Sequence, residues 1–132
     1  MHGSYDNNSF GAINRRIEQV LTGGTMLVEQ RTYTLQPGKT HEYLALYEAE
    51  ALPIQRRILG RLVGYYRSEI GALNQVVHLW AFTDLLEREQ RRAVMQADPG
   101  FKAYVQKMLP LLISQESRIL APAPFFTPTW QE

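Results

Sequence analysis

RLVGYYRSEIGALNQVVHLWAF, residues 61–82, is the stretch that decides the fold. Two runs within it, residues 61–69 and 74–82, are rich in β-branched and aromatic side chains, which is typical of strands. The connector between them, residues 70–73, is only four residues long. Because so short a connection joins neighbouring antiparallel strands, the stretch predicts a β-hairpin.

A strand and a helix are predicted before this hairpin. Residues 27–35, LVEQRTYTL, predict the strand, and QPGK at residues 36–39 predicts a turn. The helix is indicated by one stripe at steps of three and four residues, formed by Tyr43, Tyr47, Ala51, Ile54 and Ile58. Pro53 lies inside this stripe, and we expect a kink or break there because proline removes a backbone donor. Gly60 is typical of a residue that ends a helix.

Two helices and a fourth strand are predicted after the hairpin. Asp84 is expected to be the N-cap of a helix over residues 85–96. The charged residues expected on the solvated face of that helix are Glu87, Arg88, Glu89, Arg91 and Arg92. Asp98 is expected to start the next helix. Its buried stripe is predicted to be Phe101, Tyr104, Val105, Met108 and Leu109. Residues 114–120, SQESRIL, predict the fourth strand.

The predicted element order is β-α-β-β-α-α-β, the ferredoxin-like pattern with its second helix split in two. We therefore predict an α+β fold with one four-stranded antiparallel sheet and helices on one face. Residues 76–82, VVHLWAF, are apolar on both sides of their strand, which is typical of a strand buried on both faces. Since the helices can cover only one face, the other is predicted to meet the sheet of a second copy in a homodimer.

The composition excludes several classes of protein. The chain has 132 residues, a net charge of +1 and no cysteine. Its length predicts one domain. The lack of cysteine excludes disulfides and thiolate chemistry, and the balanced charge argues against a nucleic-acid partner. No apolar run reaches the length of a membrane span.

The first 25 residues differ in composition from the rest. They are rich in Gly, Asn and Ser, so residues 1–25 are predicted to be a flexible extension, with a short amphipathic helix over residues 12–21. Met26 is a candidate alternative start, and the segment lacks the apolar core of a secretory signal. The domain is then predicted to span residues 26–125, with a C-terminal tail at residues 126–132.

Four long stretches carry a family likeness: EQRTYTLQPGK (29–39), ALPIQRRILGRLVGYYRSEIGALNQVVHLWAF (51–82), LLEREQRRAVMQADPGF (85–101) and SQESRILAPAPF (114–125). In these stretches the chain resembles the NIPSNAP family. The resemblance implies a ferredoxin-like chain that pairs into a dimeric α+β barrel. The family is known for small bacterial proteins of unassigned activity and for mitochondrial relatives in eukaryotes. It therefore implies a cytoplasmic location in a bacterium, or a mitochondrial one in a eukaryote, and no catalytic residue set.

His78 is the strongest catalytic candidate. It lies in mid-strand and shares a face with Val76, Trp80 and Phe82. A histidine there can act as a base near neutral pH or as an axial haem ligand. We favour a buried neutral histidine that is bonded to a partner, because buried polar groups generally find one. No cofactor is predicted, haem is not excluded, and the three histidines lack the spacing of a metal site.

Polar side chains form a row on each of two strands. Glu29, Arg31 and Tyr33 share one face of the first strand, and Tyr65, Arg67 and Glu69 share one face of the second. The candidate ligand-binding residues are Arg31, Tyr33, Tyr65, Trp80 and Glu69. Arginine presents a fork that binds a carboxylate, so the ligand is expected to be small and apolar or anionic. The alternative, which we favour for the polar rows, is cross-strand ion pairs at a dimer interface.

The leading hypothesis is a homodimeric binding or accessory protein with a pocket between the sheet and the helices. One alternative follows from the wider dimeric α+β barrel superfamily, which includes cofactor-independent monooxygenases and isomerases. In such an enzyme His78 would be the base and Arg31 the anion clamp. The other alternative is a pure protein-interaction module, of the vesicle-transport or mitophagy type discussed for the eukaryotic relatives.

Overall fold

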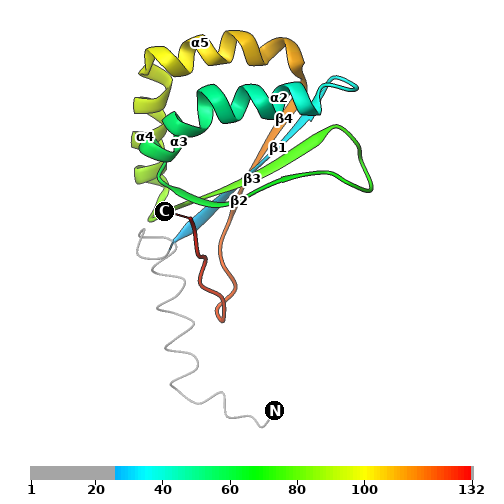
Figure 1. Cartoon of the computed structure of the whole chain (residues 1–132). Coiled ribbons are helices and arrows are strands. Elements are labelled where there is room, and N and C mark those ends of the chain that lie inside the picture. Colours follow the sequence, from blue (N-terminus) through cyan, green and yellow to red (C-terminus); the bar gives the residue numbers. More distant parts are fainter. Residues whose placement is uncertain (1–25, 132) are drawn as a thin grey trace, which may run out of the picture.

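Four strands form one antiparallel sheet in the order β2-β3-β1-β4 (Figure 1). They are β1 (Leu27–Leu35), β2 (Arg61–Arg67), β3 (Gln75–Phe82) and β4 (Leu112–Leu120). The computed structural model describes residues 26–131. The predicted extension at residues 1–25, with its short helix, lies outside the described residues. All four strands were predicted, and the hairpin of residues 61–82 is the β2–β3 pair.

The helices lie on one face of this sheet (Figure 1). The first helical segment consists of α2 (Thr40–Leu46), the π-helical turn η1 (Tyr47–Ala51) and α3 (Leu52–Ile58). The second consists of α4 (Leu85–Ala97), α5 (Pro99–Met108) and the 3-10 turn η2 (Leu109–Leu111). The fold is the predicted ferredoxin-like α+β arrangement. No helix within residues 26–131 is long and apolar enough to cross a membrane.

The irregularity of the first helical segment differs from the predicted break at Pro53. Leu52 keeps helical angles, with φ −57° and ψ −46°, so the helix does not break at the residue before the proline. The chain instead widens into the π-helical turn η1 directly before α3. Pro53 then lies in the first turn of α3, where its missing N–H does not break the helical ladder. The predicted stripe therefore stays on one side, with Tyr43, Tyr47 and Ala51 buried.

The helix-facing side of the sheet brings residues of three strands into one row. His78 of β3 lies opposite Arg31 of β1 and opposite Tyr65 of β2. Tyr65 reaches this position because the register of β2 shifts between Leu62 and Gly64. The sheet and the helices both contribute to the core. Its largest fully buried side chains include Leu35, Tyr43, Leu59, Trp80, Phe82, Met95 and Tyr104.

The opposite face of the sheet carries apolar residues with no helix over them. Val77 and Leu79 alternate with the helix-facing residues of β3 and are half-buried. Tyr66 of β2 is 62% exposed. The chain after β4 turns back towards β2, where the Gln131 N–H donates to the Leu62 carbonyl at 3.1 Å (Figure 1). β3 is thus apolar on both sides, as predicted. Burial of its open side against a second copy stays a prediction.

Side-chain caps determine where α4 and α5 begin, as the sequence predicted. The Asp84 carboxylate accepts the Glu87 N–H at 2.7 Å. The Glu87 carboxylate in turn accepts the Thr83 N–H at 2.8 Å, one residue before the usual capping-box position. Asp98 accepts the Phe101 N–H at 2.9 Å and so starts α5. Together these caps place the two helices at an angle beside the sheet.

Candidate functional site

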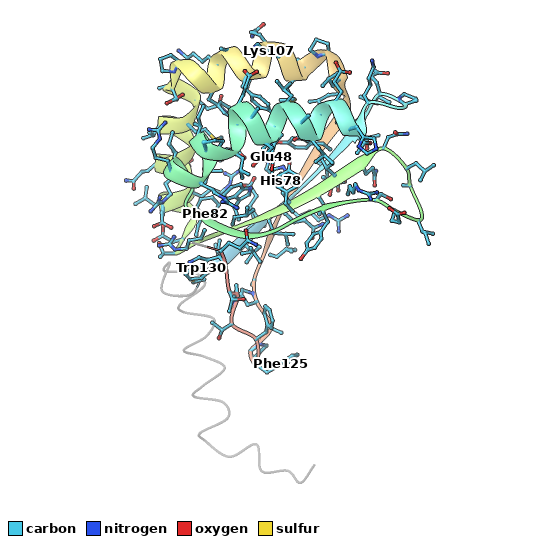
Figure 2. All side chains as sticks on the ribbon, viewed as in Figure 1. Glu48, His78, Phe82, Lys107, Phe125 and Trp130 are labelled. Carbon is cyan, nitrogen blue, oxygen red and sulfur yellow. The ribbon has the colours of Figure 1, made fainter. Side chains whose placement is uncertain are left out.

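His78 lies at the centre of the layer between sheet and helices and is 1% exposed (Figure 2). The Trp80 indole N–H donates to its Nδ1 at 2.7 Å. Because an indole can only donate, Nδ1 is the acceptor and neutral His78 carries its proton on Nε2. Burial, followed by the charge of Arg31, lowers the pKa of His78 to about 3, so the ring is neutral near pH 7. Within residues 26–131, Nε2 is buried without a hydrogen-bond partner.

Aromatic rings surround His78. The ring of Tyr65 stacks on the imidazole with centroids 4.7 Å apart and 11° between the planes. Tyr33 meets it edge-on at 5.0 Å, and Tyr47 lies at 6.3 Å. The hydroxyl groups of Tyr43 and Tyr65 share a hydrogen bond of 2.9 Å. We call this group the aromatic cluster, which consists of Tyr33, Tyr43, Tyr47, Tyr65, His78, Trp80 and Tyr104.

Four phenols of the aromatic cluster, those of Tyr43, Tyr47, Tyr65 and Tyr104, have a pKa that burial raises. Burial raises the pKa of Tyr43 and of Tyr65 far above the usual range, so both hydroxyls keep their protons. The Tyr47 hydroxyl donates to the side-chain oxygen of buried Gln55. Most polar atoms of the cluster therefore have a partner inside it or next to it, which makes this part of the layer a closed core.

A charged group lies next to the aromatic cluster, between β1 and α4. It comprises Glu29, Arg31, Arg88 and Arg92, and we call it the arginine cluster. Glu29 is 1% exposed and receives two parallel hydrogen bonds of 2.9 Å from Arg88. Arg31 donates to the same carboxylate at 3.0 Å, and the Ser117 hydroxyl donates at 2.6 Å. Arg31 also donates to the Tyr33 hydroxyl at 2.9 Å, which links the two clusters.

The electrostatics of the arginine cluster keep Glu29 ionised. Burial by itself would raise the pKa of this carboxyl, but the hydrogen bonds from Arg88, Ser117 and Arg31 hold it at about 2. Arg92 is half-buried on the same helix as Arg88. Burial, followed by the positive charge of Arg31, lowers the pKa of Arg92 below its usual range. The cluster is thus a buried anion held by an excess of cations.

A cleft of about 630 Å³ opens between β2 and the helical segment α2–η1–α3. Tyr47, Tyr65 and Tyr66 are among the residues that line it, Tyr66 from the edge where β2 meets the open face of the sheet. Its polar side chains are His41, Glu48, Arg56 and Gln131. Tyr47 and Tyr65 belong both to this wall and to the aromatic cluster, so the cleft ends on the rings that enclose His78.

The structure brings together five of the six predicted site residues. Those on the helix-facing side are Arg31, Tyr33, Tyr65, His78 and Trp80. Glu69 lies beyond the end of β2, where it is exposed and bonded to the Arg67 guanidinium. Of the six, only Tyr65 is among the residues that line the cleft. The favoured interpretation of His78 as a buried histidine with a partner agrees with its bond to Trp80.

Several residues of the site were missed from the sequence. The prediction that Arg88 lies on a solvated face is wrong, because it binds buried Glu29. A signal was present in β1, where Glu29 falls in the same inward row as Leu27 and Tyr33. A carboxylate in such a row needs a cationic partner. His41, Glu48 and Arg56 of the cleft gave no comparable signal, because exposed helix residues of these types are common.

The surroundings of His78 do not fit axial ligation of haem. The Tyr65 ring stacks on the imidazole at 4.7 Å, and Trp80 occupies Nδ1. The remaining nitrogen is enclosed in the aromatic cluster. Within the described part of the chain, no group of three or more His, Cys, Asp or Glu side chains is placed to hold a metal ion.

The sheet order and the single helical layer define a ferredoxin-like α+β protein. The same fold occurs in a Bacteroides thetaiotaomicron protein described as a candidate antibiotic biosynthesis monooxygenase. That match has a TM-score of 0.55 and 20% identity, and it covers 83% of this chain and 98% of the other. At this level of identity the likeness shows the fold alone.

The chain belongs to the NIPSNAP family, because the model of that family matches residues 28–127. An uncharacterised NIPSNAP-like domain protein from Burkholderia xenovorans is 45% identical, with a TM-score of 0.77, over 82% of this chain and 97% of the other. A nipsnap family protein with unknown function from Agrobacterium tumefaciens is 42% identical, also with a TM-score of 0.77, over 80% and 96%. The resemblance found in the sequence is confirmed.

Eukaryotic relatives are longer than this chain. Human Protein NipSnap homolog 2 is 37% identical over 105 residues, which are 80% of this chain and 36% of that protein. The Drosophila melanogaster Protein NipSnap is 30% identical over 102 residues, which are 77% of this chain and 37% of that protein. The chain thus spans about a third of the length of the curated relatives it matches.

Proposed function

We propose that this protein is a small-molecule binding module whose ligand occupies the cleft beside β2. The observation that carries the proposal is the cleft itself, which offers about 630 Å³ between the sheet edge and the first helical segment. That volume lies in the range of small-molecule sites. Aromatic walls with a few polar groups are also typical of such sites.

The lining of the cleft indicates the chemistry of the ligand. Tyr47 and Tyr65 are aromatic residues of this lining, and their rings suit a flat apolar or aromatic body. Arg56 and Glu48 place one positive and one negative side chain at the wall. A ligand with an apolar body and a polar or anionic end therefore fits best. Arg56 can bind such an end once it exchanges its 3.1 Å bond to Gln131.

The cleft is tested by filling it. Ala45 lines the cleft from α2 and is exposed, so Ala45→Trp places a large ring inside it without disturbing the core. Ala103→Trp, at an exposed position of α5 outside the lining, is the matched control. Ligand-observed NMR with indole as the probe should show binding to the unchanged chain and to Ala103→Trp, and a loss of binding to Ala45→Trp. Equal binding to both variants would contradict the proposal.

We also propose that the protein is a homodimer that pairs through the open face of its sheet. The support is the apolar character of that face, where Val77 and Leu79 have no helix over them and Tyr66 is 62% exposed. Analytical ultracentrifugation of the full chain at micromolar concentration should give the mass of two chains. A Val77→Lys substitution on this face should shift the mass to that of one chain. A single-chain mass for the unchanged protein would contradict the proposal.

The location proposed from the sequence is the cytoplasm of a bacterium, with mitochondria as the alternative in a eukaryote. It is supported by the solved relatives from Burkholderia xenovorans and Agrobacterium tumefaciens, which are bacterial. Fractionation of the native host, followed by immunodetection, tests it. Recovery in a periplasmic or secreted fraction would contradict it.

A second candidate function is an enzyme that uses His78. It is favoured by one observation, the buried Nε2 atom without a partner, beside a Tyr65 ring that also lines the cleft. Since Trp80 occupies the lone pair of Nδ1, His78 offers an N–H donor, and it becomes a base only when Trp80 releases it. A co-purified molecule that the unchanged chain converts and that His78→Gln leaves intact would support this candidate. No conversion by the unchanged chain would contradict it.

A further inference from the structure

The arginine cluster has more positive charge than its own carboxylate neutralises. Arg31, Arg88 and Arg92 face Glu29, the one carboxylate bonded within the cluster. The formal sum of three cations and one anion is an excess of two positive charges. This excess lies under α4, away from the cleft, which none of the four residues lines.

Glu29 already accepts four hydrogen bonds. One of its oxygens accepts the Arg88 Nε–H, and the other accepts from Arg88, Arg31 and Ser117. A carboxylate offers about four acceptor positions, two on each oxygen, so only the first oxygen keeps a position. The single negative charge of Glu29 is paired with Arg88 and Arg31, and none of its hydrogen bonds comes from Arg92.

Arg92 is the donor that is left over. It is half-buried, and within residues 26–131 its guanidinium makes no hydrogen bond and no ion pair. The charges of Arg31 and Arg88 act on it from nearby. Arg31 itself uses Nε on Tyr33 and Nη1 on Glu29, and its Nη2 group has no partner among the described residues. Half-buried guanidinium groups that repel one another are stabilised by an anion placed between them.

His78 supplies an independent observation at the same place. It lies directly opposite Arg31 in the register of β1 and β3, on the same face of the sheet. Its Nε2–H is a buried donor with no partner among residues 26–131. The charges of Arg31 and Arg92 both act on the imidazole. An unpartnered neutral donor thus lies opposite Arg31, within the range of the charges of Arg31 and Arg92.

We propose that the arginine cluster binds a small oxyanion, the carboxylate or phosphate group of a ligand, between the guanidinium groups of Arg31 and Arg92. The guanidinium group of Arg92 presents an N–H pair that matches two oxygens of such an anion, and the Nη2 group of Arg31 supplies a further donor. Glu29 and Arg88 act as positioning residues, because their paired bonds hold Arg31 in place. This site goes beyond the proposed cleft ligand and is separate from it.

The experiment measures thermal unfolding of the full chain in acetate and in inorganic phosphate, each against chloride at equal ionic strength. For the unchanged chain, acetate or phosphate should raise the midpoint saturably, and the stronger of the two identifies the oxyanion. Arg92→Gln should remove most of this rise and weaken the apparent affinity roughly tenfold or more, the scale of a lost charged hydrogen bond. Arg92→Lys, which keeps the charge without the fork, should keep a small part of the rise.

The control variant is Arg67→Gln, because Arg67 is exposed and paired with Glu69 at the far end of β2. It should keep the full rise. In chloride, Arg92→Gln should unfold at the same temperature as the unchanged chain or higher, since it removes a cation without a partner. A lower midpoint for Arg92→Gln in chloride would show a supporting role in the fold and overturn the proposal. No rise in either anion, or an equal rise in Arg92→Gln, would also overturn it, whatever the outcome for indole in the cleft.

Discussion

The layer between sheet and helices has two unlike halves. Under α2, η1 and α5 it is filled by the aromatic cluster, whose hydroxyl groups bond to one another and to Gln55. Under α4 it is filled by the arginine cluster, whose cations outnumber their buried carboxylate. The first half pairs most of its polar atoms internally, with Nε2 of His78 as the exception, whereas the second leaves guanidinium donors unused. One sheet face thus combines a largely satisfied core with a charged group that has donors left for a ligand.

The helices over the two halves differ in the same way. Tyr43, Tyr47 and Tyr104 turn apolar rings towards the sheet. In α4 a charged residue, Arg88, points towards the sheet. Three of its apolar residues are exposed instead, with exposed fractions of 54% for Leu85, 61% for Leu86 and 59% for Val94. Burial of apolar surface therefore holds the first half together, and hydrogen bonds to charges contribute more in the second.

The largest effect is expected from breaking the central ion pair of the charged half. Arg88→Met removes both hydrogen bonds that Glu29 receives from α4 and leaves a buried carboxylate with fewer partners. The free energy of unfolding should fall by about 3 kcal/mol. Arg118→Met, at an exposed position of β4, should change it by less than about 0.5 kcal/mol. Urea denaturation measures both, and equal losses would remove the distinction between buried and exposed arginines.

The aromatic half should make stability depend on pH through His78. Its pKa is about 3 in the folded chain against an ordinary 6.5, so below pH 6.5 the unfolded chain takes up a proton that the folded chain does not. Stability should therefore fall as the pH falls from 6.5, by about 1.4 kcal/mol per pH unit.

Glu29 adds to this loss only at lower pH. Its ordinary pKa is 4.5 and its folded pKa about 2, so its contribution disappears as the pH falls from 4.5 towards 2. The window between pH 6.5 and 4.5 therefore isolates His78. His78→Gln keeps an acceptor for Trp80 and does not titrate, so urea titrations should show a flatter profile there. An unchanged slope would assign the pH dependence to other groups.

A smaller effect is expected from the hydroxyl pair of Tyr43 and Tyr65. Each single change to Phe leaves the other buried hydroxyl without its 2.9 Å partner and should cost about 1–2 kcal/mol. The double variant should cost less than the sum, because neither member of this pair is left with an unpaired hydroxyl. A thermodynamic cycle from urea denaturation measures this coupling. Strictly additive losses would show that the two hydroxyl groups act independently. Their hydrogen bond would then not stabilise the aromatic cluster.

The smallest effect concerns the start of α4. Asp84→Ala removes the acceptor of the Glu87 N–H and should cost about 1 kcal/mol, whereas Asp84→Ser should stay close to the unchanged chain. Because α4 carries Arg88 and Arg92, the alanine variant should also weaken the response to oxyanions. Loss of stability without any change in that response would show that the cluster does not depend on how α4 begins.

The two halves also differ in how well the sequence predicted them. The strands, the caps Asp84 and Asp98 and the stripe of Tyr43 and Tyr47 were predicted because local geometry and apolar spacing determine them. The rule that apolar side chains face the core holds for Met95 of α4 but fails for Leu85, Leu86 and Val94, so the partnership of Arg88 with Glu29 was missed. Such a pair joins residues 59 positions apart, and helical spacing carries no information on it.

The irregular features followed a similar division. Pro53 indicated that the first helix is irregular. The structure has that irregularity as a π-helical turn over Tyr47–Ala51, whose buried residues Tyr47 and Ala51 belong to the core, and the position of a proline does not predict such a turn. Glu69 shares its strand parity with Tyr65, yet β2 ends at Arg67 before Glu69 can join the row. The cleft depends on the gap between β2 and the helices, which no single stretch of sequence specifies.

We propose that the arginine half of the layer binds an oxyanion while the Trp80–His78 bond of the aromatic half stays in place. The most direct measurement is NMR of the arginine Nε–H and the Trp80 indole N–H in a labelled full chain, titrated with phosphate and with acetate. We expect saturable shifts of the Arg31 and Arg92 signals, an unmoved Arg67 signal, and a Trp80 indole N–H that stays bonded to His78. Arg31 and Arg92 signals that do not move, or that move together with exposed Arg67, would contradict it.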